Sequence, residues 1–278
     1  MAVRAWYRPA AYSVLVANNA NRAPAAWLRM LESRAVFELG ASVASFPLLR
    51  LVGRGDQHPV LVLPGFMADD RSTAPLRNVL RSQGYWTHGW QLGRNLGPTA
   101  HVVEGMLERL STISERHHRP VSIVGWSLGG IYARRLAIRA PEMVRQVITL
   151  GSPFRFERGD QSSVSGLFDR LKPLHAVNLE TLLPSAVDIP ASVPATAIYT
   201  RTDGVVRWFQ CIEQMGPMRE NIEVRGSHSG LGFNPAVLFA VSDRLAQREH
   251  DWRPFCAPPL MRRMFPRPAD FDAARKAS

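Results

Sequence analysis

Ser127 is the residue of this sequence whose surroundings point most directly to chemistry. It lies between Gly125 and Gly129 in the stretch GWSLGG, after an apolar run typical of a buried strand and before apolar residues at helical spacing. A serine hydroxyl is a weak nucleophile that needs an adjacent base and an exposed position. A sharp turn from strand to helix exposes it, and glycines two residues before and after relieve the crowding of the backbone. We therefore interpret Ser127 as a nucleophile rather than as an incidental turn residue.

A serine nucleophile requires a histidine base and a carboxylate that orients this base, and both follow later in the chain. Asp203 comes directly after one predicted strand, and His228 comes after the next one, within GSHSGLG. We expect Asp203 to orient and stabilise the imidazole of His228, and His228 to accept the proton of Ser127. Asp188 is the alternative acid. Other histidines are interpreted as exposed or capping residues, namely His58, His101, His117, His118, His175 and His250.

Attack on a carbonyl group creates a negatively charged oxygen, which two backbone N–H groups must stabilise. One donor is expected from Leu128, because it starts a helix whose free N–H groups and dipole favour negative charge. The other donor is expected from Phe66, in the turn LPGF that ends the first predicted strand. Gly65, just before it, lets the backbone come close to the reacting group.

The elements that must position these residues alternate along the chain from about residue 59 onward. This alternation predicts an α/β fold with a mostly parallel central sheet and helices on both faces. A helix is expected within 70–84, capped by Asp70 or Ser72 and ended by Gly84. Further helices are expected at about 99–117, after Ser127 and over 234–247. Strands are expected within 59–66, 85–90, 121–126, 144–153, 195–203 and 221–226.

Two segments at the ends of the chain lie outside this alternation. Residues 1–57 form a predicted N-terminal helical extension, residues 58–248 the catalytic core, and residues 249–278 a C-terminal arm. The extension carries a broad apolar face, and its helix either packs on the domain or binds an interface or a partner. The residues of this face are Trp27, Leu28, Leu31, Phe37, Leu39 and Phe46.

Residues 154–193 interrupt the core between two strands, at the sheet edge where open α/β folds bind ligands. A connection of this length is typical of a lid or cap over a site. We expect either a mobile lid that lines an acyl pocket or a rigid cap that is part of the core. The apolar residues that favour such a cover are Phe154, Phe156, Leu167, Phe168, Leu171, Leu174, Leu182 and Leu183.

Five stretches, LPGF, GWSLGG, LGSP, TRTDGVV and GSHSGL, together resemble the α/β-hydrolase family over roughly residues 58–248. LGSP and TDGVV look most like its bacterial lipase and carboxylesterase branches, and GWSLGG also resembles methyl esterases that act on carrier-bound acyl chains. The resemblance implies a serine acyl-enzyme mechanism without cofactor or metal. The turn PGF departs from the HGGG run of some esterases, which disfavours that branch, and Ser127 excludes an aspartate nucleophile of the haloalkane type.

The function predicted from these residues is hydrolysis of carboxylic esters by a serine esterase or lipase, with a small-molecule ester or acyl compound as substrate. An acyltransferase or a thioesterase is the alternative, because either would use the same triad with a different acceptor or leaving group. A cofactor-free perhydrolase or haloperoxidase is a further variant. A non-catalytic binding protein with this fold is disfavoured, since all three triad candidates are present.

Composition narrows the choice of partners. The formal net charge is +11, yet only Lys172 and Lys276 are lysines, and the arginines are scattered rather than clustered. A nucleic-acid partner is therefore not expected, while peripheral contact with an anionic membrane surface stays open. Cys211 and Cys256 are too few for a metal site, and they are either two thiols or one bridge.

The N-terminal stretch shows no secretory signal, so the expected location is cytoplasmic. No run of about 18 apolar residues predicts a membrane span. The sequence does not indicate an oligomeric state.

Overall fold

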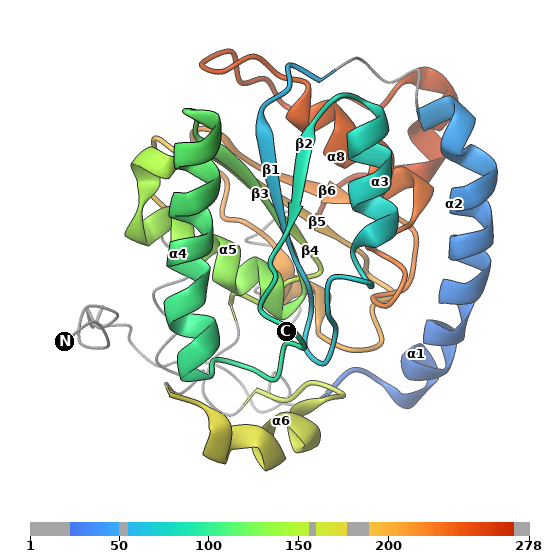
Figure 1. Ribbon diagram of the computed structural model, residues 1–278. Coiled ribbons are helices and arrows are strands. Elements are labelled where there is room, and N and C mark those ends of the chain that lie inside the picture. Colours follow the sequence, from blue (N-terminus) through green and yellow to red (C-terminus); the bar gives the residue numbers. More distant parts are fainter. Residues whose placement is uncertain (1–22, 50–54, 156–159, 177–188, 270–278) are drawn as a thin grey trace.

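The computed structural model describes residues 23–49, 55–155, 160–176 and 189–269. At its centre lies one sheet of six parallel strands in the spatial order β2-β1-β3-β4-β5-β6 (Figure 1). The α/β fold predicted from the sequence is confirmed. The strands are β1 (Pro59–Leu63), β2 (Trp86–Gly89), β3 (Val121–Trp126), β4 (Val144–Leu150), β5 (Ala195–Tyr199) and β6 (Arg219–Glu223).

Helices cover both faces of the sheet. Figure 1 shows α4 and α5 on one face, α3 and α8 on the other, and α2 running outside α8. The α-helices are α1 (Ala26–Met30), α2 (Ala35–Leu49), α3 (Ala74–Ser82), α4 (Ala100–His117), α5 (Leu128–Arg139), α6 (Ser165–Leu171) and α8 (Pro235–Leu245). Short 3-10 helices are η2 (Leu31–Arg34), η3 (Pro141–Met143), η4 (Lys172–Leu174), η6 (Trp208–Cys211) and η7 (Pro259–Met264).

The register of the strands brings their carboxyl ends to one edge of the sheet. Leu63 is paired with Gly125, Trp126 with Leu150, and Tyr199 with Glu223. All the loops that follow these strands therefore begin side by side, although they are separated by up to about 160 residues of sequence. This edge is the place where the predicted site residues can meet.

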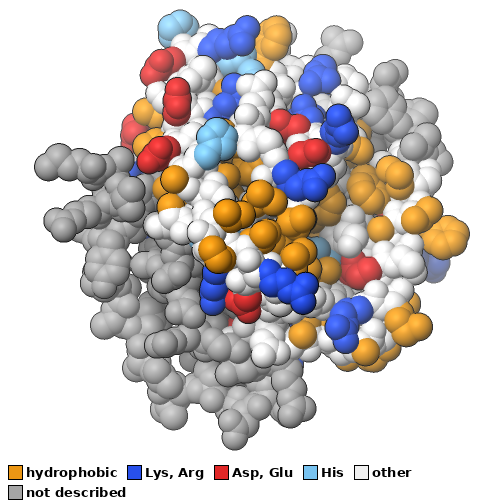
Figure 2. Space-filling model, turned by 60° about the horizontal axis from the view of Figure 1, so that its bottom comes forward, with side chains coloured by type: hydrophobic (Ala, Val, Ile, Leu, Met, Phe, Trp, Pro, Cys, Tyr) orange, Lys and Arg blue, Asp and Glu red, His pale blue; other side chains and the backbone are white. Residues whose placement is uncertain are grey.

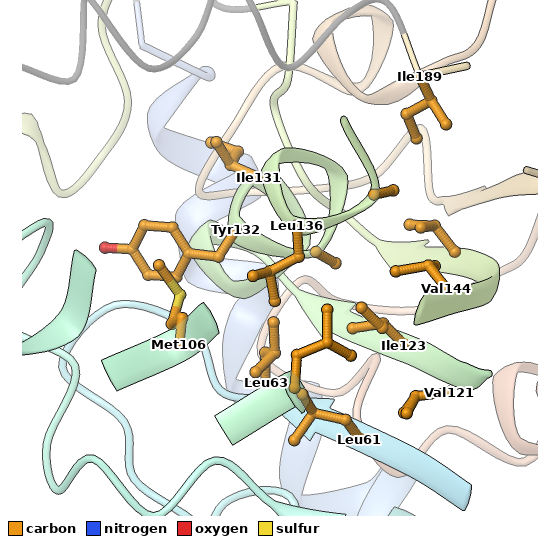
Figure 3. Packing of buried hydrophobic residues seen from close by; sticks show 14 of the residues in the cluster. Leu61, Leu63, Met106, Val121, Ile123, Ile131, Tyr132, Leu136, Val144 and Ile189 are labelled. Carbon is orange, nitrogen blue, oxygen red and sulfur yellow. The ribbon is translucent and has the colours of Figure 1, made fainter. Parts of the chain in front are cut away.

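Two apolar layers hold the helices to the sheet. Figure 3 shows the layer between the strands and the helices α4 and α5, in which strand residues point toward the helix residues. Each aliphatic side chain that is fully buried in this way contributes roughly 1.5–3 kcal/mol relative to an exposed one. The members of this layer that Figure 3 labels are Leu61, Leu63, Met106, Val121, Ile123, Ile131, Tyr132, Leu136, Val144 and Ile189.

The helix expected within 70–84 is shorter than predicted and begins without the predicted cap. It starts at Ala74, and no side chain caps it. The carboxylate of Asp70 instead accepts hydrogen bonds from the backbone N–H groups of Trp90 and Gln91, at 2.9 and 3.0 Å, and so ties down the loop after β2. Gly84 follows the end of this helix with a positive φ of 95°, which is the conformation expected of a glycine that ends a helix.

The two cysteines are not bridged. Cys211 is buried and Cys256 is exposed, and both thiols are free, so the alternative of one disulfide is wrong. Over the described ranges, no helix is long and apolar enough to cross a membrane.

The N-terminal extension packs on the domain through polar residues, and its apolar face points outward. Trp27 and Phe37 are 60% and 81% exposed, and Leu31 and Leu39 are also exposed, whereas Leu28 is partly buried. Of the two alternatives, packing of these helices on the domain is observed, but these four apolar side chains lie outside that contact, and the side chain of Phe46 is not among the described ones. The physical reason is that the loops beneath offer backbone N–H and carbonyl groups, which need charged or polar partners such as Glu32, Arg34 and Glu38 rather than apolar contacts.

Candidate active site

Ser127 lies at the turn between β3 and α5 in a strained conformation. Its φ of 53° and ψ of −121° are unusual for a residue with a side chain. The turn is tight, because a Cβ on Gly125 would collide with the backbone of Gly130, and a Cβ on Gly129 would collide with the carbonyl oxygen of Leu63. Glycine at these two positions is thus what allows the serine to project from the edge of the sheet.

Ser127, His228 and Asp203 form a continuous hydrogen-bonded chain. The Oγ of Ser127 lies 3.0 Å from Nε2 of His228, and Nδ1 of His228 lies 2.7 Å from Oδ2 of Asp203. The other carboxylate oxygen of Asp203 accepts the N–H groups of Val205 and Val206, both at 2.8 Å. Since Asp203 is an acceptor, the proton of a neutral imidazole lies on Nδ1, and Nε2 is left to accept the serine proton.

The charge around His228 favours its protonated form. Burial by itself lowers the pKa of His228, but the charge of Asp203, its hydrogen bond to Nδ1 and the charge of Glu32 outweigh burial and raise the pKa above its ordinary value. An imidazolium formed during a reaction is therefore stabilised in place. The site has the electrostatics required of a general base that must hold a proton for a moment and return it.

The two predicted N–H donors come from two elements next to the nucleophile, the turn after β1 and the start of α5. A Cβ on Gly65 would lie 3.2 Å from the Cβ of Ser127, which places the following residue, Phe66, beside the serine. Leu128 is the first residue of α5, so its N–H has no partner within its own helix. Among the described residues, the N–H of Phe66 also has no hydrogen-bond acceptor. Both N–H groups are thus available to an oxyanion.

Asn95 holds this turn in shape, a function that the sequence analysis did not assign to it. It is fully buried. Its side-chain Nδ2 donates to the carbonyl oxygen of Pro64 at 2.9 Å, and its backbone carbonyl oxygen accepts from the N–H of Met67 at 2.7 Å. The only signal in the sequence is an asparagine in the glycine-spaced stretch QLGRNLGPT. That pattern predicts a loop but does not say what the loop contacts.

Two residues from neighbouring motifs complete the surroundings of the histidine. Gly151, in LGSP, has a φ of 54°, and a Cβ there would lie 3.1 Å from Nδ1 of His228 and 3.4 Å from Oδ2 of Asp203. The indole N–H of Trp126 donates to the backbone carbonyl oxygen of His228 at 3.1 Å. Gly151 therefore leaves room for the imidazole and carboxylate, and Trp126 restrains the histidine loop.

The segment predicted as a lid lies over this edge of the sheet in its described part. The ring of Phe168, on α6, lies 5.2 Å from that of Phe66 and 4.7 Å from that of His175. The side chain of His175 contacts the carbonyl oxygen of Leu96 at 2.9 Å, and the hydroxyl of Ser163 donates to the carbonyl oxygen of Gly204. Figure 2, which turns this end of the molecule forward, shows hydrophobic side chains gathered near the middle of the face.

Several residues of the predicted lid have a different environment. Phe154 is fully buried, with the guanidinium of Arg134 stacked 3.7 Å from its ring centre, which fits the alternative in which it is part of the core. It follows β4 directly and the packing under the sheet edge encloses it. Leu167 and Leu174 are 40% and 53% exposed and point away from the core. Phe156, Leu182, Leu183 and the alternative acid Asp188 lie outside the described residues.

The histidines set aside by the sequence analysis are not at this site, with the exception of His175 in the cover. His101, His118 and His250 are exposed, as expected. His117 is partly buried and contacts His88. His58 is fully buried, so its prediction as an exposed or capping residue is wrong. It precedes a strand whose burial extends one residue further than the apolar pattern indicates.

Comparisons with known proteins bear on the fold. No protein-family model matches the sequence, and no curated protein matches it. Among solved structures, Aspergillus fumigatus lipase B is similar with a TM-score of 0.54 and 15% identity, over 80% of this chain and 57% of that one. The chain thus spans somewhat more than half the length of that lipase. This likeness shows that the chain has the α/β-hydrolase fold that its motifs predict.

Two smaller proteins are similar at lower scores. A structure of the metagenome-derived lipolytic enzymes LipS and LipT has a TM-score of 0.49 and 17% identity, over 68% of this chain and 93% of that one. The monoacylglycerol lipase of Paleococcus ferrophilus has a TM-score of 0.47 and 14% identity, over 68% of this chain and 96% of that one.

Proposed function

We propose that this protein is a serine hydrolase that cleaves carboxylic esters through an acyl-enzyme intermediate. The observation that carries the proposal is the hydrogen-bonded chain from Ser127 through His228 to Asp203, at the sheet edge where α/β folds bind ligands. In this proposal Ser127 is the nucleophile, His228 the general base and acid, and Asp203 the group that orients the imidazole. The N–H groups of Phe66 and Leu128 bind the oxyanion.

In the first half-reaction, Oγ of Ser127 attacks the carbonyl carbon of the ester while Nε2 of His228 takes the serine proton. The carbonyl oxygen becomes an oxyanion, which accepts hydrogen bonds from the N–H groups of Phe66 and Leu128. When the intermediate collapses, the bond to the alkoxy oxygen breaks. This oxygen takes the proton from Nε2 and leaves as the alcohol, and the acyl group stays on Ser127.

In the second half-reaction, water takes the place of the alcohol. Nε2 of His228 removes a proton from the water, whose oxygen attacks the acyl carbon, and the oxyanion again lies between the two N–H groups. Collapse breaks the bond to Oγ of Ser127, which recovers its proton from Nε2. Asp203 keeps its charge throughout and stabilises the imidazolium at both stages.

The acyl side of the substrate is proposed to be apolar. Support comes from the rings of Phe66 and Phe168, which pack on each other, Phe66 being the residue after Gly65, whose backbone lies against Ser127. A thioester substrate or an alcohol acceptor would use the same residues, because only the leaving group or the second nucleophile changes. Analysis of the products in the presence of competing alcohols separates hydrolysis from acyl transfer.

A lipid surface is proposed as a peripheral partner of the same face. The exposed apolar residues of α1, η2 and α2 support this, since half of the large hydrophobic residues exposed in the described chain lie there. Figure 1 shows α1 at the end of the molecule where the carboxyl ends of the strands, and with them the candidate site, lie. The net charge of +11 favours anionic surfaces. The apolar residues concerned are Trp27, Met30, Leu31, Val36, Phe37 and Leu39.

The decisive experiment is hydrolysis of p-nitrophenyl esters of increasing acyl length by the purified protein and by Ser127→Ala. We expect turnover by the wild type, with a preference for acyl chains longer than acetyl. The variant should keep the fold and lose about 10⁶-fold in kcat, leaving only the contribution of binding and the oxyanion site. Turnover near the wild-type rate in Ser127→Ala would overturn the proposal, and so would the absence of turnover on every ester and thioester tried.

A further inference from the structure

The side chain of Glu32 connects the N-terminal extension to both loops that carry the predicted acid and base. Its Oε1 accepts hydrogen bonds from the backbone N–H groups of Gly204, at 2.8 Å, and His228, at 3.1 Å. Its Oε2 accepts the N–H of Ser229 at 2.8 Å. One carboxylate therefore joins the residue after Asp203 to His228 itself and to the residue after it.

We propose that Glu32 is a positioning residue, which holds the loop of Asp203 and the loop of His228 in the register that lets their side chains meet. The inference rests on the proposed function, because it assigns a role in the reaction of that same site. The inference also goes beyond the proposed function, since Glu32 lies outside the segment 58–248 in which the motifs of the site were found. Its effect on the reaction passes through His228, because its contacts in this site are to the backbone of the two loops and to the hydroxyl of Ser229.

The residues that follow Glu32 act on the same two loops. The guanidinium of Arg34 donates to the carbonyl oxygens of Thr202, at 3.0 Å, and Gly226, at 2.6 Å. Oε1 of Glu38 accepts the N–H of Ser227 at 2.8 Å. The acid loop and the histidine loop are thus each bound by an anionic and a cationic side chain of the extension, and Glu32 is the member nearest to the imidazole.

The fit between the extension and the acid loop is close enough to require glycine at position 204. A Cβ on Gly204 would collide with the backbone carbonyl group of Leu28. A Cβ on Gly230 would collide with the carboxylate of Glu38, and one on Gly226 would lie 3.1 Å from it. Gly204 belongs to TDG, so part of what that motif encodes is room for the N-terminal helices.

Glu32 also changes the electrostatics of the base. The charged groups on the elements packed against His228 are Asp203 on the acid loop, and Glu32, Arg34 and Glu38 on the extension. Burial opposes ionisation of Glu32, but the hydrogen bonds from Ser229, Gly204 and His228 outweigh it and hold the pKa of Glu32 below its usual value. Glu32 is therefore ionised at neutral pH, and its charge adds to that of Asp203 in raising the pKa of His228.

The test compares Glu32→Gln, Glu32→Asp and the control Glu142→Gln with the wild type. Glu32→Gln keeps the shape of the side chain but removes its charge and one acceptor oxygen. Glu32→Asp keeps the charge and shortens the side chain. Glu142 is an exposed residue of η3, at the other end of the sheet, so its variant makes the same change in net charge away from the site. The readouts are the pH profiles of kcat and KM for a short p-nitrophenyl ester, thermal unfolding, and titration of His228 by NMR of ¹⁵N-histidine-labelled protein.

In Glu32→Gln we expect the NMR titration midpoint of His228 and the acidic limb of the kcat/KM profile to move to lower pH together. We also expect kcat on the alkaline plateau to fall about tenfold, with KM within about twofold of the wild type. Glu32→Asp should keep the titration midpoint of His228 near the wild-type value, with a smaller plateau kcat, and Glu142→Gln should match the wild type in every readout.

One result would overturn the inference: a Glu32→Gln protein whose His228 titration and plateau kcat equal those of the wild type, whether or not its thermal unfolding changes. If Glu32→Gln does not fold, Glu32→Asp decides by its plateau kcat. Should the wild type hydrolyse no ester, the proposed function falls, whereas the NMR titration still reports whether Glu32 acts on His228.

Discussion

Ser122 and His58 are hydrogen-bonded at the opposite end of the sheet from Ser127 and His228, with 2.8 Å between Oγ and Nε2. The other ring nitrogen of His58 contacts the carboxylate of Asp56. The molecule therefore contains a second serine–histidine–aspartate chain, where β1 and β3 begin instead of where they end.

This second chain lacks what makes the first one suited to catalysis. Ser122 is the second residue of β3 and is fully buried with His58, so no substrate reaches its hydroxyl. Ser127, by contrast, leaves the strand at a strained turn beside available N–H donors. The same three residue types thus hold a structure together at one end of the sheet and are suited to acyl transfer at the other.

His58 should make the fold sensitive to acid. Burial and the charge of Arg145 lower the pKa of His58 to about 4. Its pKa in the unfolded chain is near 6.5, so the unfolded state binds the extra proton and the free energy of unfolding decreases as the pH falls from about 6.5 toward 4. We expect this group to account for about 2 kcal/mol of the stability lost between pH 7.5 and pH 5.

Urea unfolding of the wild type and of His58→Asn at pH 7.5 and pH 5 measures this contribution. The variant is expected to be less stable at pH 7.5, because its side chain cannot bond both Asp56 and Ser122 as the imidazole does. Its loss of stability between the two pH values should be smaller than that of the wild type. An equal loss in both proteins would contradict the expectation.

Asp203→Asn should lower kcat by about 10⁴-fold and leave the fold intact. The amide no longer accepts the Nδ1 proton of His228 as a carboxylate does, so the imidazole adopts the wrong tautomer and cannot accept the proton of Ser127. Rates with p-nitrophenyl acetate, together with circular dichroism, test this. If Asp203→Asn is silent and Asp188→Asn is not, the acid has been misassigned.

The rate of hydrolysis should rise with pH along a single limb, because only the neutral form of His228 accepts a proton. Since its partners raise the pKa of His228, the midpoint of kcat/KM should lie above the ordinary histidine value of about 6.5. Activity is then complete above the midpoint and is lost as the pH falls through it. A profile that is flat between pH 5 and pH 8 would exclude a histidine base.

Phe168→Ala should change the preference for acyl length. The substitution removes the ring that packs on Phe66, and with it apolar surface that we propose a long acyl chain contacts. We expect kcat/KM to fall about tenfold for long-chain esters and little for acetate. Leu174→Ala is the control, because Leu174 lies in the same segment but is 53% exposed. A change in thermal stability with an unaltered chain-length profile would show that the segment has only a structural role.

Binding to vesicles should depend on the outward apolar face of the N-terminal helices. We expect co-sedimentation with phosphatidylglycerol vesicles and weaker binding to phosphatidylcholine vesicles. Binding to the anionic vesicles should decrease as the salt concentration is raised. Phe37→Ser should reduce binding, since this side chain is 81% exposed on α2. Leu260→Ser, at a residue of η7 that is even more exposed, should not. Equal binding by the two variants would exclude this face as the site of contact.

The fold and the three residues of the hydrogen-bonded chain follow from local patterns in the sequence. Alternating apolar runs predict a parallel sheet, and in such a sheet every carboxyl end reaches the same edge. Ser127, Asp203 and His228 each follow a strand, so their meeting follows from the sheet alone. The glycines around Ser127 are equally local, because the turn that needs them is only a few residues long.

Contacts between distant segments were decided only by the tertiary structure. Glu32 is 196 residues from His228, and nothing in its own neighbourhood indicates which N–H groups it accepts from. For the same reason the pattern of apolar residues does not show which side of the N-terminal helices contacts the domain, and Phe154 and His58 are more deeply buried than their local sequence suggests. Apolar periodicity indicates only whether a face is buried or exposed on average. A docking surface that presents loop N–H groups selects carboxylates instead, and the position of this surface depends on how all six strands are arranged.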